Sequence, residues 1–502
     1  MTAAAARRTT VREPAREVPV LLNVDVIVAG AGIAGIFAAL SAAKHGARTV
    51  LIDRFGSVGG NYGPGLGSRH DFWQHPSLHA RALGGAVGAF LTRLEQMGGL
   101  GTFAFTGGGD YRDWSWEGMR ELPVIDNDAF GYLALRSLEE AGVQLLLSTD
   151  VAGAIVDGTR VTGVFVETKS GRRAVLGGVV VDSTGDADVA VSAGAPIADV
   201  FSWATPGIGL FFRVGGVDWE RYEQFRSDAK AKPLPPDLDE WRTTVFEPAL
   251  TVEWPNYPHE LMPAIRQEWE SGEYRYVQTV GDLTNVYLIP FGIHNQAVTT
   301  VEMTPTTKVD PTNPLHRSLL ESKFRQYIYE TVQFLQRHTP GFERVSIEQI
   351  APFMGTRYSR TIDPEYTLTP DDIWGSRAFD DVIHQLTQLR TPEGLVDFKS
   401  GEEGVVYELP YRMLLPKEVD GLLAAGRAAN VETSSRLRAR WIVMLTGGIA
   451  GVAAALAARD GSSPRALDRR ALQRTLLDDG FYLGDDTRLA ELGLPLPSAT
   501  SP

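Results

Sequence analysis

Three glycines, Gly30, Gly32 and Gly35, form the pattern G-x-G-x-x-G directly after a run of apolar, β-branched residues. In a strand–turn–helix unit the first glycine permits a tight turn and the second lets the backbone approach a pyrophosphate. The third lets the helix pack closely on the strand. The N–H groups at the start of the helix then face the phosphates. This spacing predicts the binding of a dinucleotide.

An acidic residue follows at the place where a ribose hydroxyl is expected. The small-residue segment from Ile36 to His45 is typical of a helix, and Gly46 ends it. A second apolar run, residues 48–52, ends on Asp53. An acidic group about 20 residues beyond the glycines accepts hydrogen bonds from the ribose in dinucleotide folds. Residues 24–53 therefore predict a complete βαβ unit.

Histidines and arginines are the candidates for moving protons and holding a substrate. Histidine has an ordinary pKa of about 6.5, which suits proton transfer near neutral pH. His75 precedes Pro76, so capping of a helix is its other interpretation, and His294 after a strand-like segment is equally ambiguous. Arg357 and Arg360 could bind an anionic substrate group bidentately, or could form ion pairs with nearby acids.

Composition excludes several classes of function. The 502-residue chain has 62 acidic and 48 basic residues and a formal net charge of −14. Nucleic acids and anionic membranes attract basic patches, so we expect neither as a partner. The absence of cysteine excludes thiolate catalysis and cysteine-ligated metal centres. We predict no metal site, no bilayer-spanning stretch of about 20 apolar residues and, by default, a cytoplasmic protein that acts on a small molecule.

The composition and the pattern of expected strands and helices divide the chain into five segments. Residues 1–19 predict a disordered tail, and residues 20–197 the first part of the dinucleotide-binding domain. Tryptophans, prolines and short strand-like pieces in residues 198–350 predict an inserted substrate domain. Residues 351–420 either continue the substrate domain or connect it back to the first domain. Residues 421–502 complete the first domain with a last strand and C-terminal helices. Whether the chain forms a homo-oligomer is left open.

Apolar periodicity predicts the longer helices. They cover residues 80–97, 128–141, 315–337, 441–459 and 465–480. The glycines of residues 84–88 predict a helix break.

Taken together, these motifs identify a family resemblance. The chain resembles the FAD-dependent oxidoreductases of the glutathione-reductase structural class, and within them the single-chain FAD-dependent oxidoreductase family. The segments that carry the resemblance span about residues 20–485 in the family's order. They are residues 24–35 with Asp53, Gly59-Gly60, 181–188, 357–360, 365–368 with Asp372, 409–412, 425–427 and 447–451.

The resemblance implies an α/β fold with FAD as the cofactor: a discontinuous Rossmann-type FAD-binding domain with an inserted mixed α/β substrate domain. Adenine is expected beside Asp53 and Val151, the pyrophosphate over Gly32, and the flavin ring near residues 447–451, read as a helix start with free N–H groups. Close packing of a small-sided helix is the other interpretation of that segment. The implied cofactor residues are Gly30, Gly32, Ile33, Ala34, Gly35, Asp53, Arg54, Gly59, Gly60, Asn61, Val151, Thr184, Gly185, Asp186, Gly426, Arg427, Gly447, Gly448 and Ala450.

The redox chemistry would belong to the flavin, and protein groups would orient the substrate and move protons. The sequence has no second strand–G-x-G-x-x-G–helix unit, so electrons would come from the substrate, a transiently bound nicotinamide or a partner protein. The first expectation is a dehydrogenase or reductase that moves a hydride between a small organic substrate and flavin N5. A flavin-dependent monooxygenase is the alternative, and a non-catalytic electron-transfer or assembly subunit is the alternative from another class.

Overall fold

The computed structural model describes most of the chain. The described residues are 11, 13–67, 84–102, 123–198, 208–230, 235–238, 240–241, 261–273, 279–280, 283–287, 291–293, 296–305, 310–356, 359–388, 390–391, 394–395, 405–429 and 440–496. The candidate residues His75, His294 and Arg357 lie outside them.

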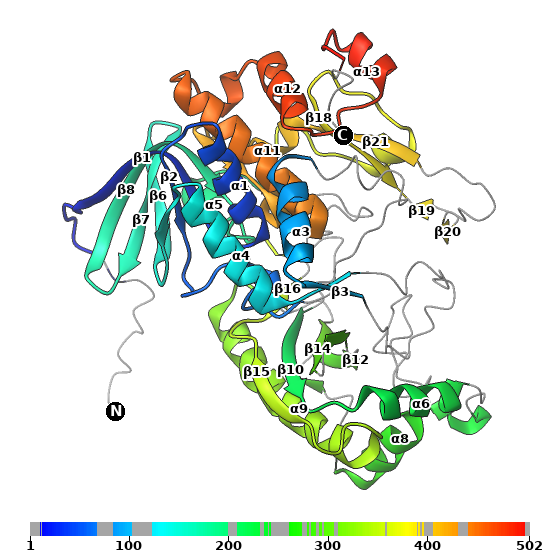
Figure 1. Ribbon diagram of the computed structural model, residues 1–502. Helices are drawn as coiled ribbons and strands as arrows, with labels where there is room; N and C mark the ends of the chain where they lie inside the picture. The colour runs from blue at the N-terminus through cyan, green and yellow to red at the C-terminus, as the bar shows by residue number, and fades with distance from the viewer. Residues whose placement is uncertain are drawn as a thin grey trace, which may run out of the picture.

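A parallel sheet forms the centre of the first unit (Figure 1). Its strands run in the order β5, β2, β1, β8, and β22 pairs with the end of β8. Because these strands are covered on both faces, they are continuous apolar runs rather than alternating ones. The bounds are β1 Val20–Ala29, β2 Thr49–Ile52, β5 Gln144–Leu146, β8 Gly171–Asp182 and β22 Leu422–Ala424.

Strand β8 belongs to two arrangements at once. Along its first half it pairs antiparallel with β7, Arg160–Thr168, which pairs in turn with β6, Asp150–Asp157. At its end it pairs parallel with β22, about 240 residues further along the chain. The return of β22 to this sheet confirms the expectation of a discontinuous Rossmann-type unit.

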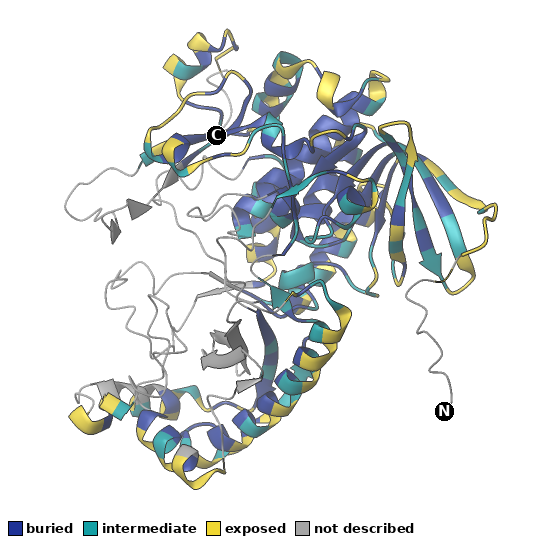
Figure 2. Cartoon of the chain, turned by 180° about the vertical axis from the view of Figure 1, so that it is seen from behind, coloured by how far each residue is buried: buried dark blue, intermediate teal, exposed yellow. Residues whose placement is uncertain are grey.

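Helices α1, Ile33–Lys44, and α11, Arg440–Arg459, pack on one another and on the sheet. They form the darkest, most buried part of the molecule in Figure 2. Helix α11 is long and apolar enough to cross a membrane by length and composition, which corrects our expectation that no stretch reaches this length. However, 89% of its apolar window is buried inside the fold, so its apolar surface is used as core.

Two further helices cover this core, α3, Gly85–Gln96, and α4, Asn127–Glu140. Residues 84–88 were predicted to interrupt a helix over residues 80–97; α3 begins at Gly85, and residues 80–83 lie outside the described part of the chain. A Cβ on Gly84 would overlap the Gly480 carbonyl, and a Cβ on Gly85 would lie 2.6 Å from the Phe481 ring. These two glycines therefore serve close packing against the C-terminal segment.

The second unit is a mostly antiparallel sheet backed by a long helix. Strand β10 pairs with both β14 and β15, and its buried side chains Leu210, Phe212 and Val214 join one core with Phe324 and Ile328 of α9. The bounds are β10 Ile208–Gly215, α6 Trp219–Lys230, α8 Met262–Ser271, β11 Thr279–Val280, β12 Leu283–Tyr287, β13 Phe291–Ile293, β14 Gln296–Pro305, α9 Pro314–His338, β15 Ser346–Ile350 and β16 Gly355–Thr356. This confirms a mixed α/β unit inserted into the first.

Two connections join the units side by side. On the first unit's side, β9, Ile197–Ala198, pairs antiparallel with β17, Thr361–Ile362. On the other side, the start of β10 pairs with β16. The segment that leaves the first unit and the segment that returns to it are therefore paired at both ends of the connection. The exact domain boundaries stay predictions.

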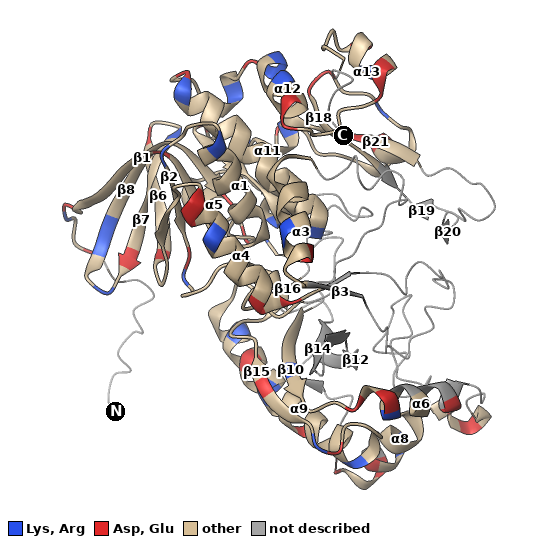
Figure 3. Ribbon diagram, in the orientation of Figure 1, with Lys and Arg blue, Asp and Glu red and all other residues tan. Residues whose placement is uncertain are grey.

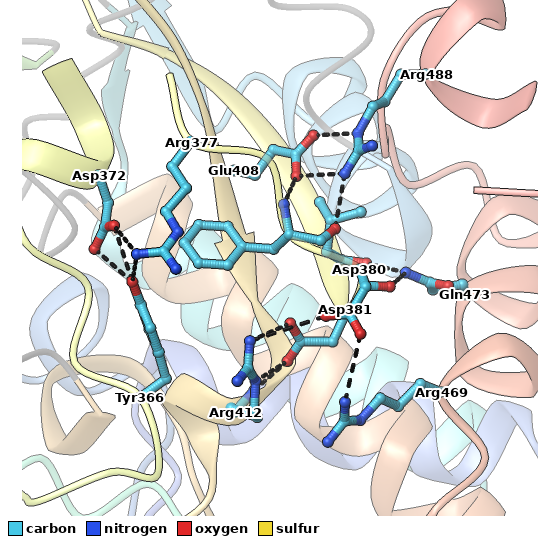
Figure 4. Close-up of polar contacts among 12 residues, drawn as sticks. Tyr366, Asp372, Arg377, Asp380, Asp381, Glu408, Arg412, Arg469, Gln473 and Arg488 are labelled. Atoms are coloured by element: carbon cyan, nitrogen blue, oxygen red, sulfur yellow. Dashed lines mark hydrogen bonds and ion pairs between the residues drawn. The ribbon is translucent and has the colours of Figure 1, made fainter. Parts of the chain in front are cut away.

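The C-terminal part completes the fold with a polar network (Figure 4). Asp381, fully buried, accepts two hydrogen bonds from the Arg412 guanidinium at 2.9 and 3.1 Å, and Arg488 pairs with buried Glu408 at 2.6 Å. The Asp381–Arg412 pair joins the two residues that flank the open end of the β18–β21 hairpin, and the Arg488–Glu408 pair fastens α13 to β21. The remaining bounds are β3 Leu100–Thr102, β4 Pro123–Ile125, α5 Asp188–Ser192, α10 Pro370–Trp374, β18 Val382–Gln388, β19 Arg390–Thr391, β20 Gly394–Leu395, β21 Val405–Pro410, α12 Arg469–Asp478 and α13 Asp486–Glu491.

Acidic and basic residues are interspersed over the outer helices, such as α9 and α12 (Figure 3). The predicted helix over 465–480 is shorter, because Asp468 caps it and α12 begins at Arg469.

Candidate functional site

The turn at Gly30–Gly35 needs glycine at two positions for packing. Gly30 has φ +99°, and its N–H donates to the Ile52 carbonyl at 2.8 Å. A Cβ on Gly30 would lie 2.6 Å from the Ser183 carbonyl oxygen, and a Cβ on Gly35 would overlap the Gly30 carbonyl. These contacts bring strand, turn and helix as close together as the motif predicts.

Gly32 is different, because among the described residues none lies against the place where its side chain would be. It is the N-cap of α1, and no described atom would lie within 4 Å of a Cβ placed there. No described side chain caps this helix end. Ile33 and Ala34 form the first turn beside it and are buried. The first N–H groups of α1 are therefore available to an anion, as a bound pyrophosphate requires.

Asp53 supports the same turn from strand β2. Its Oδ2 accepts a hydrogen bond from the Ala31 N–H at 2.6 Å, and its Oδ1 accepts one from the Phe55 N–H at 2.8 Å. Burial raises the pKa of Asp53, although these two N–H groups and the neighbouring Arg54 oppose the shift. The Asp53 carbonyl also accepts from the Thr149 N–H at 2.9 Å. This bond holds the start of β6, which contains Val151, beside the end of β2.

Asp53→Ala is expected to weaken FAD retention roughly ten- to a hundredfold. A charge-assisted hydrogen bond to a ribose hydroxyl contributes about 1.5–3 kcal/mol, and the substitution also leaves the Ala31 N–H without its acceptor. Asp53→Asn keeps one acceptor oxygen and is the matched control, with a smaller loss. Gel filtration with absorbance of bound flavin measures both. Full flavin occupancy in Asp53→Ala would show that the adenosine end lies elsewhere.

A glycine-rich loop lies directly over the turn. Gly59 has φ +109° and donates from its N–H to the Ala31 carbonyl at 2.9 Å. A Cβ on Gly60 would lie 2.8 Å from Gly32 Cα. Next to it, Asn61 Oδ1 is buried and, within the described part of the chain, accepts no hydrogen bond. An acceptor without a donor beside the turn fits a bound group that brings a donor.

The end of β8 closes the turn from the other side. Ser183 Oγ donates to the carbonyls of Ala29 and Gly30, both at 2.8 Å. Thr184 Oγ1 donates to Asp182 Oδ1 at 2.7 Å and accepts from the Asp188 N–H. The hydroxyl of Thr184, one of the implied cofactor residues, is thus engaged in holding the strand end.

Beyond Thr184, Asp186 and Arg427 form an ion pair at 2.8 Å. Ser359 Oγ donates to the same Asp186 oxygen, and Arg427 Nη1 donates to Ser359 Oγ at 2.7 Å and to Thr356 Oγ1 at 2.8 Å. Burial opposes ionisation of Asp186, but the Arg427 charge and these hydrogen bonds lower its pKa. Ser359 and Thr356 were not among the predicted site residues, since only the Arg-x-x-Arg pattern around them gave a signal.

Arg427→Gln is expected to lower the free energy of unfolding by about 2–4 kcal/mol. Removing one partner of a buried pair costs about 3–5 kcal/mol, and we discount this because the side chains of Arg427 and Asp186 remain 24% and 18% exposed. The double variant Asp186→Asn/Arg427→Gln should recover part of the loss. Urea unfolding of the four proteins measures the coupling, and additive losses would contradict it.

Arg360 forms an ion pair with Asp188. This favours the structural interpretation of Arg360, although its partner is distant in the sequence rather than nearby. Arg54 is exposed, and its guanidinium lies 5.1 Å from the centre of the Phe55 ring.

The expectation that a helix starts at Gly447 was wrong. Gly447, Gly448 and Ala450 lie inside α11, which is already helical at Arg440. A Cβ on Gly447 would overlap the Ala34 carbonyl, and one on Gly451 would overlap the Ala38 carbonyl. The backbone N–H groups of these residues are therefore used in the hydrogen bonds of the helix itself, and the glycines let α1 and α11 pack closely on one another. Gly426, with φ +64°, packs against the same helices, since a Cβ there would lie 3.0 Å from the Ala34 methyl.

A model of the FAD dependent oxidoreductase family matches residues 25–476. The chain belongs to this family. The match covers the open turn, the strand ends around it and the inserted unit. FAD is therefore the cofactor of this flavoprotein oxidoreductase. The helix start at Gly32 and the Asn61 oxygen, neither of which has a partner among the described side chains, fit it.

Solved structures of other proteins are similar to this FAD-dependent oxidoreductase over most of its length. A geranylgeranyl bacteriochlorophyll reductase-like protein from Thermoplasma acidophilum is 12% identical, with a TM-score of 0.42, covering 94% of this chain and 96% of that one. An anhydrotetracycline hydroxylase from Streptomyces rimosus is 13% identical, with a TM-score of 0.42 and coverage of 91% and 65%. A p-nitrophenol 4-monooxygenase from Pseudomonas putida is 12% identical, with a TM-score of 0.40 and coverage of 94% and 92%. Comparison with curated protein sequences finds no relative.

Proposed function

We propose that this enzyme is an FAD-dependent dehydrogenase or reductase of the glutathione-reductase structural class, which moves a hydride between a small organic substrate and flavin N5. When bound, FAD supplies the two-electron chemistry. The observation that carries the proposal is a single dinucleotide site in a chain without cysteine. The flavin must then exchange electrons either with a small molecule that binds beside it or with a partner protein. Strand β8, shared by a parallel sheet and an antiparallel β6–β7–β8 ribbon, supports the class.

The inserted sheet supports a substrate site beside the cofactor turn. Leu66 of the glycine-rich loop belongs to the core of the inserted unit, together with Ile208 of β10. Phe353, just before β16, stacks on Phe55 with ring centres 4.8 Å apart. The loop over the nucleotide turn is therefore continuous with the second unit, and a substrate bound between them would meet the flavin.

We propose that protons move through His75 or His294 and that Arg357 holds an anionic substrate group. The ion pair of Arg360 with Asp188 gives Arg360 a supporting role instead. His75→Ala is expected to leave FAD bound and to slow turnover, as measured by steady-state kinetics on the flavin-loaded variant. Wild-type turnover in this variant would remove His75 from the mechanism.

Anaerobic stopped-flow spectroscopy tests the reaction type. A panel of substrate classes is mixed with the flavin-loaded enzyme, and the loss of the oxidised flavin absorbance is followed. Bleaching by an organic substrate without dioxygen supports the dehydrogenase. A spectral transient that forms only when reduced enzyme meets dioxygen would establish the monooxygenase. Neither signal, together with a stable protein partner in pull-downs, would establish the non-catalytic subunit.

A further inference from the structure

The strand order fixes the direction in which FAD lies. Across the carboxyl edge of the parallel sheet the order is β2, β1, β8, β22. Asp53 follows β2, the Gly30–Gly32 turn follows β1, Asp186 lies beyond β8, and Arg427 beyond β22. A dinucleotide with its ribose at Asp53 and its phosphates at Gly32 therefore extends toward β8 and β22, and its ring reaches the far side of β1.

The first residue of α11 lies on that far side. Gly426 follows β22, and a Cβ there would lie 3.1 Å from Val443 of the first turn of α11. Arg440 begins this turn, and its guanidinium lies against Gly67. A Cβ built on Gly67 would lie only 2.7 Å from Arg440 Nη2. The Arg440 guanidinium carbon lies 5.1 Å from the centre of the Tyr62 ring. Gly67 and Tyr62 belong to the loop whose Gly60 contacts Gly32.

Arg440 therefore places a permanent positive charge beside the loop that contacts the Gly30–Gly32 turn. The inserted unit reaches the same loop through Leu66, and Phe353 would lie 3.1 Å from a Cβ on Gly65. The charge is thus located where the second unit, the loop and α11 meet. Two-electron reduction gives the pyrimidine part of a flavin negative charge, and a fixed cation nearby stabilises it.

We propose that Arg440 faces the pyrimidine edge of the flavin and raises its reduction potential. This role goes beyond the proposed reaction, because it depends on FAD binding and not on which substrate is oxidised or reduced. The competing role is purely structural, with Arg440 stacked on Tyr62 to hold the loop. The two roles differ in what they predict for the flavin when the charge is removed but the loop remains in place.

Sulfite and redox titrations of flavin-loaded Arg440→Gln test the proposal without any substrate. Sulfite adds to N5 of oxidised flavin and leaves negative charge on the pyrimidine, so its affinity reports a nearby cation. We expect Arg440→Gln to bind sulfite at least tenfold more weakly. We also expect the two-electron reduction of its flavin to be tenfold less favourable, which corresponds to a reduction potential about 30 mV lower. Arg440→Lys, which keeps the charge, should stay within about threefold of the wild type on the same scale.

Arg459→Gln is the matched control, because it removes the same charge from the exposed opposite end of the same helix. It should leave both measurements unchanged. The proposal is overturned if Arg440→Gln matches the wild type in sulfite affinity and potential. A folded Arg440→Gln protein that binds no FAD at saturating cofactor would also overturn it, since Arg440 would then act in cofactor retention. A wild type that takes up no FAD would instead refute the cofactor site itself.

Discussion

Replacing Gly32 with aspartate is expected to weaken FAD binding at least a hundredfold while the apoprotein stays folded. In the protein alone the new Cβ meets no described atom within 4 Å, and φ is −70° at this position. Aspartate is a preferred N-cap, so α1 should lose nothing. A carboxylate about 4 Å from the pyrophosphate, however, costs about 4 kcal/mol at an effective dielectric constant of 20. A hundredfold loss of affinity corresponds to about 2.8 kcal/mol.

Gly35→Ala is the control for the added Cβ, because it places a side-chain carbon three residues away in the same turn of the chain. That Cβ would overlap the Gly30 carbonyl and lie 2.7 Å from Ser183 Oγ. We expect a loss of at least 1–3 kcal/mol in stability from overpacking. Fluorescence titration with FAD and thermal unfolding of each apoprotein separate the two effects. Wild-type FAD affinity in folded Gly32→Asp would contradict the position of the pyrophosphate.

Acidification is expected to destabilise the protein through His384. This histidine of β18 is fully buried against Phe481, and neither ring nitrogen has a hydrogen-bond partner in the described part of the chain. Burial lowers its pKa to about 3, whereas the unfolded chain binds the proton with a pKa of about 6.5. Between these values the unfolded state holds more protons, so stability falls as the pH falls. The loss approaches 1.4 kcal/mol per pH unit below 6.5 and reaches about 4 kcal/mol near pH 3.

Urea unfolding of the wild type and His384→Leu at pH 7.5 and pH 5 measures this contribution. The wild type should lose about 2 kcal/mol more than the variant between the two pH values. The leucine variant also removes two unsatisfied nitrogens, so it should be at least as stable as the wild type at pH 5. Equal pH dependence in the two proteins would show that His384 is not sealed from water in the folded state.

The sequence predicted the parts of the fold that depend on local patterns. The βαβ unit over residues 24–53, the return of β22 and helices α4 and α9 follow from apolar runs, glycine turns and caps that neighbouring residues specify. The long-range contacts could not be predicted. Asp186 meets Arg427 from 241 positions away, and nothing near Ser359 marks it as a third member of that cluster.

Small residues gave the misleading signals. Gly447–Gly451 was interpreted as a helix start, but these residues lie inside α11, and Gly447 and Gly451 let α1 approach it. A glycine in the sequence thus indicated that another segment packs closely against it, but it did not indicate which segment. His384 gave no signal at all, because a single histidine in an apolar strand looks the same whether it is buried or exposed.

A crystal structure of the FAD-loaded protein is the most direct test of the cofactor site. We predict adenine beside Asp53 and Val151, the pyrophosphate at the start of α1 over Gly32, and the flavin ring beyond β8 with its pyrimidine edge toward Arg440. Phosphate density away from Gly32, or a ring on the β5 side of the sheet, would contradict the account.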